Sequence, residues 1–354
     1  MSESKYLASA SDGKEILRIL ESSAAKGNIE LIYTRRPEAY ESYMKESGEA
    51  RVFVSRDGER TVGTCAEIVR EVYIGGEVCR AAYICGLKKD AEYDGGVAFD
   101  TRLIRDLRRD DIHYYFCSVV ADNTHAQKMF EKSRRLLDMK QTVGYKTYIL
   151  SPKVKITEKK HGFTFRRATE NDRETLIGFL NAEGKKKDLF PVIKTLDEFY
   201  NLSIEDFYLL LDGEHVVASA ALWDQTDYKQ YVVKKYRGVM RLARMANPIL
   251  SALRYIQLPK ENQPLAFPML SFLISRNDNP EYYRIMLAEI KKVIAGSYDM
   301  FVIGLPREHF AAPMLDKLPS ISFETKLYAI RFPWSEQAYK LPDPQKSFLE
   351  CGLL

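Results

Sequence analysis

The chain of 354 residues is 45% hydrophobic and 29% charged, and its formal net charge is +4. The length predicts two domains, and the charged share is typical of a soluble protein. The small net charge argues against a nucleic-acid-binding protein, and no apolar run is long enough to span a bilayer.

The cysteines and histidines argue against a disulfide framework and a metal centre. The five cysteines have no C-x-x-C spacing, and the five histidines are scattered along the chain. Because four of the cysteines lie in apolar runs, we expect buried, reduced thiols, as in a cytoplasmic protein. The N-terminal residues lack the apolar core of a signal peptide, which agrees with that location.

The first half of the chain predicts strands and helices in alternation. A strand at Lys5–Ala10 leads to helices at Gly13–Ala24 and Glu38–Glu46, and a hairpin follows over residues 51–68 with an Asp-Gly turn. The remaining predicted elements are a strand at 79–87, a helix at 97–109, a strand at 113–121, a helix at 123–137 and a strand at 143–150.

The second half repeats this order. Residues 57–68 resemble residues 212–223, the segment that begins at Glu92 resembles the one at Glu281, and the segment around Phe116 resembles the one around Phe301. Three matches in the same order indicate two related domains in tandem. The boundary is predicted in the lysine-rich stretch at 151–162.

The expected fold class is α/β, with two domains that each have a mixed, mostly antiparallel sheet flanked by helices. We place the first domain at 1–152, the second at 160–337, and a tail at 338–354. The second domain carries an insertion at about 224–262.

The insertion has eight basic residues and no acidic ones between Tyr228 and Lys260. Its apolar residues recur at helical spacing, which predicts an amphipathic helix docked on the domain: Val232, Tyr236, Val239, Met240 and Ala243. The basic residues lie mostly off that stripe: Lys234, Lys235, Arg237, Arg241 and Arg244. They predict either a solvated face or a patch for an acidic substrate, the phosphate of a cofactor, or RNA.

A pair of glycines, Gly95 and Gly96, stands between a predicted strand and a predicted helix. Glycine backbone lets a ligand approach closely, and the start of a helix offers free N–H groups, so the turn could cradle a pyrophosphate. The alternative is a tight turn with no ligand.

These features together resemble the GNAT superfamily of acetyl-CoA-dependent N-acetyltransferases in its tandem, two-domain form. The family's phosphate motif, [Q/R]-x-x-G-x-[G/A], is met at Gly96-Val97-Ala98, although Tyr93 stands where Gln or Arg is usual. Downstream, Asn123 and the MFEK run resemble N-x-x-A-x-x-L-Y-E-K, with Phe130 in place of the tyrosine. The second half has no glycine at its corresponding turn, so we expect it to be a degenerate copy.

The resemblance implies a protein that uses acetyl-CoA as co-substrate, with no metal, and acetylates an amine of a small molecule or peptide. The strand end formed by Leu87, Lys88 and Lys89 would face the pantetheine and the thioester carbonyl. The turn formed by Gly95, Gly96, Val97 and Ala98 would hold the pyrophosphate. Asn123 and Phe130 would complete the cofactor site.

Four residues are candidates for the proton transfers. Glu67 interrupts an apolar run and is the predicted base, unless it simply lies on the solvated face of its strand. Tyr83 is a second candidate. Because Phe130 cannot donate a proton, either Tyr145 or Tyr148 of the closing strand protonates the leaving thiolate, or water does so, or no acetyl transfer occurs.

Two alternatives to the acetyltransferase remain open. One is an aminoacyl-tRNA-dependent transferase of the peptidoglycan-bridge type, favoured by the basic insertion. The other is a non-catalytic acyl-CoA-binding protein, favoured by Tyr93 and Phe130. We expect no membrane partner and no nucleic acid except in the tRNA alternative, and a homodimer is compatible with the sequence.

Overall fold

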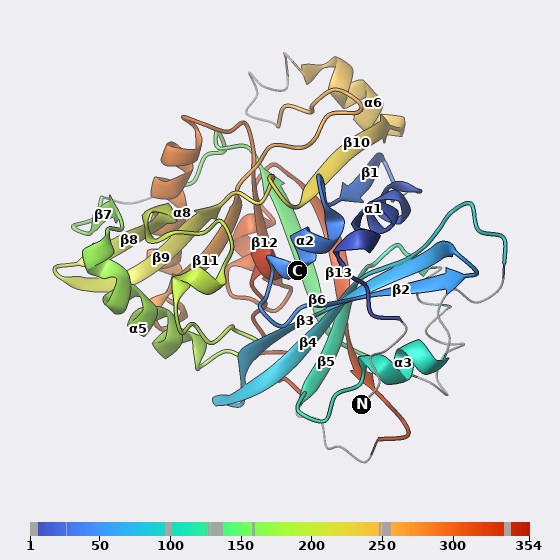
Figure 1. Cartoon of the computed structure of the whole chain (residues 1–354). Coiled ribbons are helices and arrows are strands. Elements are labelled where there is room, and N and C mark those ends of the chain that lie inside the picture. The colour runs from blue at the N-terminus through green and yellow to red at the C-terminus, as the bar shows by residue number, and fades with distance from the viewer. Residues whose placement is uncertain are drawn as a thin grey trace.

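A computed structural model describes residues 6–25, 27–95, 101–124, 126, 128, 137–157, 160–247, 249, 256–335 and 341–354. Its main feature is a central sheet, flanked by helices, that runs through both halves of the chain (Figure 1). Across the described residues, eleven strands follow one another in the order β2-β3-β4-β5-β13-β6-β12-β11-β9-β8-β7. The mixed α/β fold class is confirmed, with one continuous sheet joining the two halves.

The described helices and strands of the first half alternate irregularly along the chain, and the last of these strands, β6, lies beyond β13 in the sheet. They are α1 (Gly13–Glu21), β1 (Ile29–Thr34), α2 (Ala39–Met44), β2 (Arg51–Asp57), β3 (Arg60–Ile74), β4 (Glu77–Lys89), α3 (Thr101–Leu107), β5 (Tyr114–Val120) and β6 (Asp138–Leu150).

The second half follows the same plan with the insertion added. Its elements are β7 (Thr164–Arg167), α5 (Arg173–Gly184), β8 (Phe207–Asp212), β9 (His215–Trp223), β10 (Gln230–Tyr236), α6 (Gly238–Met245), β11 (Met269–Ser275), α8 (Pro280–Ile294), β12 (Phe301–Pro306), α9 (Ala312–Leu315) and β13 (Ser320–Arg331), with a final 3₁₀ turn, η6 (Cys351–Leu353).

The two halves exchange their closing strands at the centre of the sheet (Figure 1). The last strand of the second half, β13, pairs with β5 of the first, and the last strand of the first half, β6, pairs with β12 of the second. Strands β6 and β13 also pair with each other along their whole length. Each half therefore completes its sheet with a strand of the other.

The alternation of side chains in β2 and β3 builds a core on each face of the first half. Val52, Val54 and Ile68 pack with α1 and α2, whereas Phe53 and Cys65 pack on the opposite face, the side of α3. The first helix agrees with its sequence pattern, because Ile16, Ile19 and Leu20 are its buried side chains.

Two local predictions were wrong. The described part of Lys5–Ala10 forms only an isolated bridge from Leu7 to Phe53, because Ser9 starts a 3₁₀ turn whose Asp12 accepts from the Ser9 amide. In the insertion, Val232 and Tyr236 lie on strand β10 and not on a helix. Residues four apart share a side of a strand as well as of a helix, so the spacing fitted both.

Strand β1 was not predicted, and it pairs antiparallel with β10 of the insertion to form a second, two-stranded sheet. The ladder runs from Ile29 opposite Tyr236 to Thr34 opposite Gln230. This pairing ties the insertion of the second half to the first half. Among the described helices, none is long and apolar enough to cross a membrane.

Candidate active site

The parallel strands β4 and β5 part in the middle of the first half. They pair only over Ala81–Ile84 and Tyr114–Cys117, after which β5 continues its ladder with β13 alone. The apolar side chains at the two diverging ends, Leu87 and Val120, are 43% and 45% exposed. Parted strand edges with exposed apolar side chains are suited to a narrow, partly apolar ligand.

Strand β4 carries a bulge where it leaves β5. Thr64 pairs with Lys88 and Ala66 with Cys85, so one residue of β3 faces two residues of β4. The first of these two, Gly86, has a φ of +60°, which side chains disfavour. Bulges commonly re-aim the backbone beside active sites, so the bulge marks this strand end as a candidate binding point.

The hydroxyl of Tyr43 approaches this bulge from α2. A Cβ on Gly86 would lie 2.1 Å from the Tyr43 hydroxyl oxygen, so only glycine fits beneath it. Tyr43 is fully buried, and among the described residues its hydroxyl has no hydrogen-bond partner. Burial raises the pKa of Tyr43 despite the opposing effect of Arg35, so the phenol stays protonated. It is a buried hydrogen-bond donor, without a partner in the described part of the chain, next to the bulge.

Behind Tyr43 lies a buried charge cluster, formed by Arg35, Glu46 and Lys229, with the half-buried Arg70 next to it. The Arg35 guanidinium contacts the Glu46 carboxylate, and its central carbon lies 3.8 Å from the centroid of the Tyr43 ring. Lys229 comes from the second half, and its Nζ lies 3.5 Å from Glu46 Oε2. Burial alone would raise the pKa of Glu46, but Arg35, Lys229 and Arg70 hold it at about 2. The cluster thus fixes α2 against the insertion.

The structure does not bring the predicted catalytic residues Glu67, Tyr83 and Tyr145 together. Glu67 is buried on the α3 side of β3, where its Oε2 accepts from Arg51 Nε at 2.5 Å, and burial raises its pKa. Tyr83 points to the opposite face of the sheet, with its hydroxyl 2.6 Å from Ser118 Oγ of β5. Tyr145 lies on β6, and its hydroxyl donates to the Leu349 carbonyl.

The predicted cofactor residues are partly used by the fold itself. Lys88 Nζ donates to the Leu20 and Ser23 carbonyls at the end of α1, and burial lowers the pKa of Lys88 to about 8. Lys89 Nζ donates to the Gly95 carbonyl at 3.0 Å, so it lies at the predicted phosphate turn. Asn123 Oδ1 accepts from the Ala126 amide. The remaining predicted positions, Gly96, Val97, Ala98 and Phe130, lie outside the described residues.

Tyr93 organises the described part of the turn where the family has Gln or Arg. Its hydroxyl donates to Asp57 Oδ2 at 3.0 Å, and a Cβ on Gly95 would lie 2.2 Å from its ring. Asp90, at the start of the turn, is buried and accepts from Arg18 and Arg60 at 2.8 Å each. The turn is therefore built by side chains that sequence motifs did not identify.

The equivalent place in the second half is filled by the chain itself. Strands β11 and β12 pair only at Met269 and Val302, and Phe272 in β11 has a φ of +50° at a bulge like that of β4. Here Glu350 Oε2 accepts from the Phe272 amide at 2.6 Å, and burial raises the pKa of Glu350 to about 7. A carboxylate oxygen thus binds the bulge amide of the second half.

The turn before α8 is also closed by a side chain. Asn279 Oδ1 accepts from the amides of Glu281 and Tyr282, which are the N–H groups that a phosphate would need. Neither the bulge nor the helix start of the second half is left for a cofactor.

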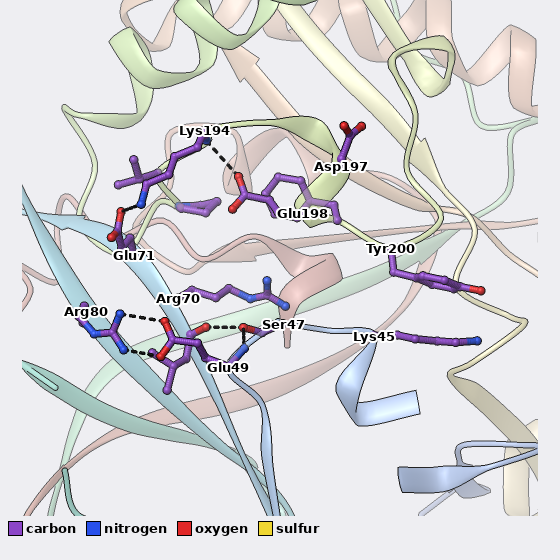
Figure 2. A pocket seen from close by; sticks show the side chains of 15 residues that line it. Lys45, Ser47, Glu49, Arg70, Glu71, Arg80, Lys194, Asp197, Glu198 and Tyr200 are labelled. Carbon is purple, nitrogen blue, oxygen red and sulfur yellow. Dashed lines mark hydrogen bonds and ion pairs between the residues drawn. The ribbon is translucent and has the colours of Figure 1, made fainter. Parts of the chain in front are cut away.

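A cavity of about 520 Å³ lies between the halves, lined by the loop that follows α2 and by residues of the segment 191–200 (Figure 2). Its walls carry both signs of charge, including the Arg80–Glu49 and Lys194–Glu71 ion pairs at 2.6 and 2.8 Å. Lys45 lies over the Tyr200 ring at the other end. The lining residues are Lys45, Ser47, Gly48, Glu49, Val69, Arg70, Glu71, Arg80, Pro191, Val192, Lys194, Asp197, Glu198, Phe199 and Tyr200.

No family model and no curated protein matches the chain. Solved structures, in contrast, match the chain in fold. A structure of Saccharomyces cerevisiae N-myristoyltransferase with bound myristoyl-CoA has a TM-score of 0.57 at 7% identity, over 95% of this chain and 84% of that one. A second structure of it with myristoyl-CoA gives 0.58 at 7% identity, over 98% and 85%. A GCN5-related N-acetyltransferase from Anabaena variabilis gives 0.48 at 11%, over 82% and 65%.

The likeness extends over nearly the whole chain, with both halves included. At so low an identity it shows the fold alone: this chain has the GNAT fold in its tandem, two-domain form, as its sequence predicts. Within the described residues, no three His, Cys, Asp or Glu side chains are grouped so that they could hold a metal ion.

Proposed function

We propose that this protein is an acyl-CoA-dependent N-acyltransferase whose reaction takes place in the first half, where β4 leaves β5. The observation that carries the proposal is the glycine bulge at Gly86, with the unpartnered hydroxyl of Tyr43 directed at it. A backbone kink and a protonated phenol at one point suit a carbonyl oxygen that gains negative charge.

A contact in the second half supports this proposal. There the matching bulge binds a carboxylate oxygen, that of Glu350, through the Phe272 amide. By the correspondence of β4 with β11, the backbone of the first-half bulge would bind the oxygen of a thioester carbonyl. The second half would then not compete for the ligand, so we expect one acyl-CoA per chain.

The bound acyl-CoA supplies an activated acyl group and a thiolate leaving group. In the reaction the amine nitrogen forms a bond to the carbonyl carbon, the carbon–sulfur bond breaks, and the thiolate takes up a proton. Tyr43 would donate a hydrogen bond to the carbonyl oxygen or thiolate sulfur. Glu46 is ion-paired and Glu67 faces the other side of the sheet, so the proton of the amine would leave to water.

The first experiment measures binding of CoA thioesters, from acetyl to long-chain, by calorimetry. Replacing Gly96 with valine should weaken binding at least tenfold, or about 1.4 kcal/mol, because the side chain would obstruct the backbone of the predicted phosphate turn. The matched control is Gly162→Val, since a Cβ on Gly162 would meet no atom within 4 Å. Equal affinity of the two variants would remove the turn from the binding site.

The second experiment measures thiol release with a panel of amines. Turnover would establish the transferase, whereas binding without turnover would establish the non-catalytic acyl-CoA-binding protein. Mass spectrometry of ligands retained on purification tests the alternative donor, because a bound aminoacyl-tRNA would exclude acyl-CoA as the donor.

Tyr43→Phe should lower kcat at least tenfold and leave acyl-CoA affinity unchanged. It removes one donor and keeps the packing of the ring. Tyr40→Phe on the same helix is the matched control, and it should retain full kcat. If both variants turn over like the wild type, Tyr43 has no part in the reaction, although the transferase proposal would stand.

A further inference from the structure

Helix α6 presents an apolar stripe to solvent. Val239, Leu242, Met245 and Ile249 are 71%, 66%, 75% and 65% exposed, and they follow one another at intervals of three, three and four residues. The spacing places Val239, Leu242 and Met245 on one face of α6, and Ile249 lies beyond the end of the helix. Four large aliphatic side chains so exposed are unusual on one short segment of a soluble protein.

This stripe differs from the one predicted by the sequence. Met240 and Ala243 pack against the core as expected, but Val239 does not. The predicted stripe assumed one long helix, but α6 is short and follows a strand. The face with which α6 docks is therefore narrower than the predicted face. The apolar residues left over face outward.

Three exposed cations lie close to the stripe in the sequence. Lys234 and Lys235 are exposed on the end of β10, and Arg241 is exposed on α6. Within the described ranges none of the three forms an ion pair, whereas Arg237 pairs with Glu30 and Arg244 donates to the Pro259 carbonyl. With no acidic residue from 228 to 260, nothing in this part of the sequence offsets their charge.

The helix is held firmly to the body of the protein. Strand β10 pairs with β1 immediately before it, and the Arg237 amide donates to the Asn28 carbonyl at 2.8 Å. Figure 1 shows α6 outward from β10, at the margin of the molecule. Helix α6 and the end of β10 therefore stand on a fixed support.

We propose that α6 is a docking surface for an anionic lipid bilayer. A bilayer satisfies both features at once: its acyl boundary takes up the aliphatic side chains, and its acidic headgroups attract the three cations. RNA would neutralise the cations but leave the apolar stripe in water. The protein would lie on the membrane by this helix and would not span it, and the proposal stands independently of the catalytic one.

The test is co-sedimentation of the full chain with vesicles of phosphatidylcholine alone or mixed with phosphatidylserine, at low and moderate salt. We expect binding to the mixed vesicles only, and weaker binding at moderate salt. The triple variant K234E/K235E/R241E and the double variant L242S/M245S should each lower the partition coefficient at least tenfold. The matched controls are K140E/K155E/K317E and V78S/F323S, which alter exposed residues elsewhere.

Each other outcome overturns the proposal. Wild-type protein that does not sediment with the mixed vesicles, or that sediments as well with phosphatidylcholine alone, has no anionic-lipid surface. Equal sedimentation of wild type and both α6 variants places the contact elsewhere. Binding of tRNA that the triple variant loses, without vesicle binding, would assign the cations to RNA. A dimer seen by size exclusion and lost in L242S/M245S, again without vesicle binding, would assign the stripe to a second copy. Thermal unfolding of every variant confirms that it is folded.

Discussion

Gly86→Ala is expected to reduce acyl transfer at least about a hundredfold, the effect of removing one donor from an oxyanion hole. Gly86 has a φ of +60°, and its added Cβ would lie 2.1 Å from the Tyr43 hydroxyl oxygen. The bulge and the tyrosine cannot both keep their positions, so the backbone and the phenol would be displaced together. The measurement is kcat by thiol release, with the free energy of unfolding determined in parallel.

Gly75→Ala separates backbone strain from this local effect. Gly75 has nearly the same φ, +61°, but a Cβ there would meet nothing within 4 Å. Gly75→Ala should lower the free energy of unfolding by only about 1–2 kcal/mol, because of backbone strain, and should retain activity. Adding Tyr43→Phe to Gly86→Ala removes the nearest clashing atom and should recover part of the stability but no activity. If Gly86→Ala and Gly75→Ala behave alike, the bulge is only a feature of the strand.

The sequence predicted those parts of the fold that depend on residues close together in the chain. The hairpins at Asp57-Gly58 and Asp212-Gly213 depend on local alternation and a short turn, and both formed as predicted. The repeated order of elements was sufficient to indicate the tandem GNAT fold. The exchange of β6 and β13 could not be predicted, because alternation shows which face of a strand is buried but not which strand lies beside it.

The candidate site was harder to predict for the same reason. Tyr43 lies in a short helix whose pattern indicates only a buried face, and nothing local relates it to Gly86. Lys229 reaches Glu46 from the insertion, across 183 residues of sequence. By contrast the sequence marks Glu67 as a candidate because a carboxylate interrupts an apolar strand, and the ion pair with Arg51 gives that carboxylate a structural role.

The buried charge cluster carries the second large expected effect, on stability. Glu46→Ala should lower the free energy of unfolding by about 3–5 kcal/mol, because it leaves Arg35 and Lys229 buried without their shared carboxylate. Glu170→Ala is the matched control: it breaks the Arg173 ion pair at the surface, where water screens the charges, and should have a much smaller effect. Urea denaturation of both variants and the wild type provides the comparison.

The pH dependence gives an independent test of the same cluster. The pKa of Glu46 is about 2 in the folded protein, below its ordinary value, so the unfolded state binds the proton first as the pH falls. The contribution of Glu46 should therefore be complete above about pH 5 and decline as the pH falls toward the folded pKa. Glu46→Gln lacks this titration, so the stability difference between wild type and variant should narrow over that range. A difference that stays constant from neutral pH to the acid limit would mean that the carboxylate is not held ionised by Arg35 and Lys229, and that the cluster does not join the two halves by charge.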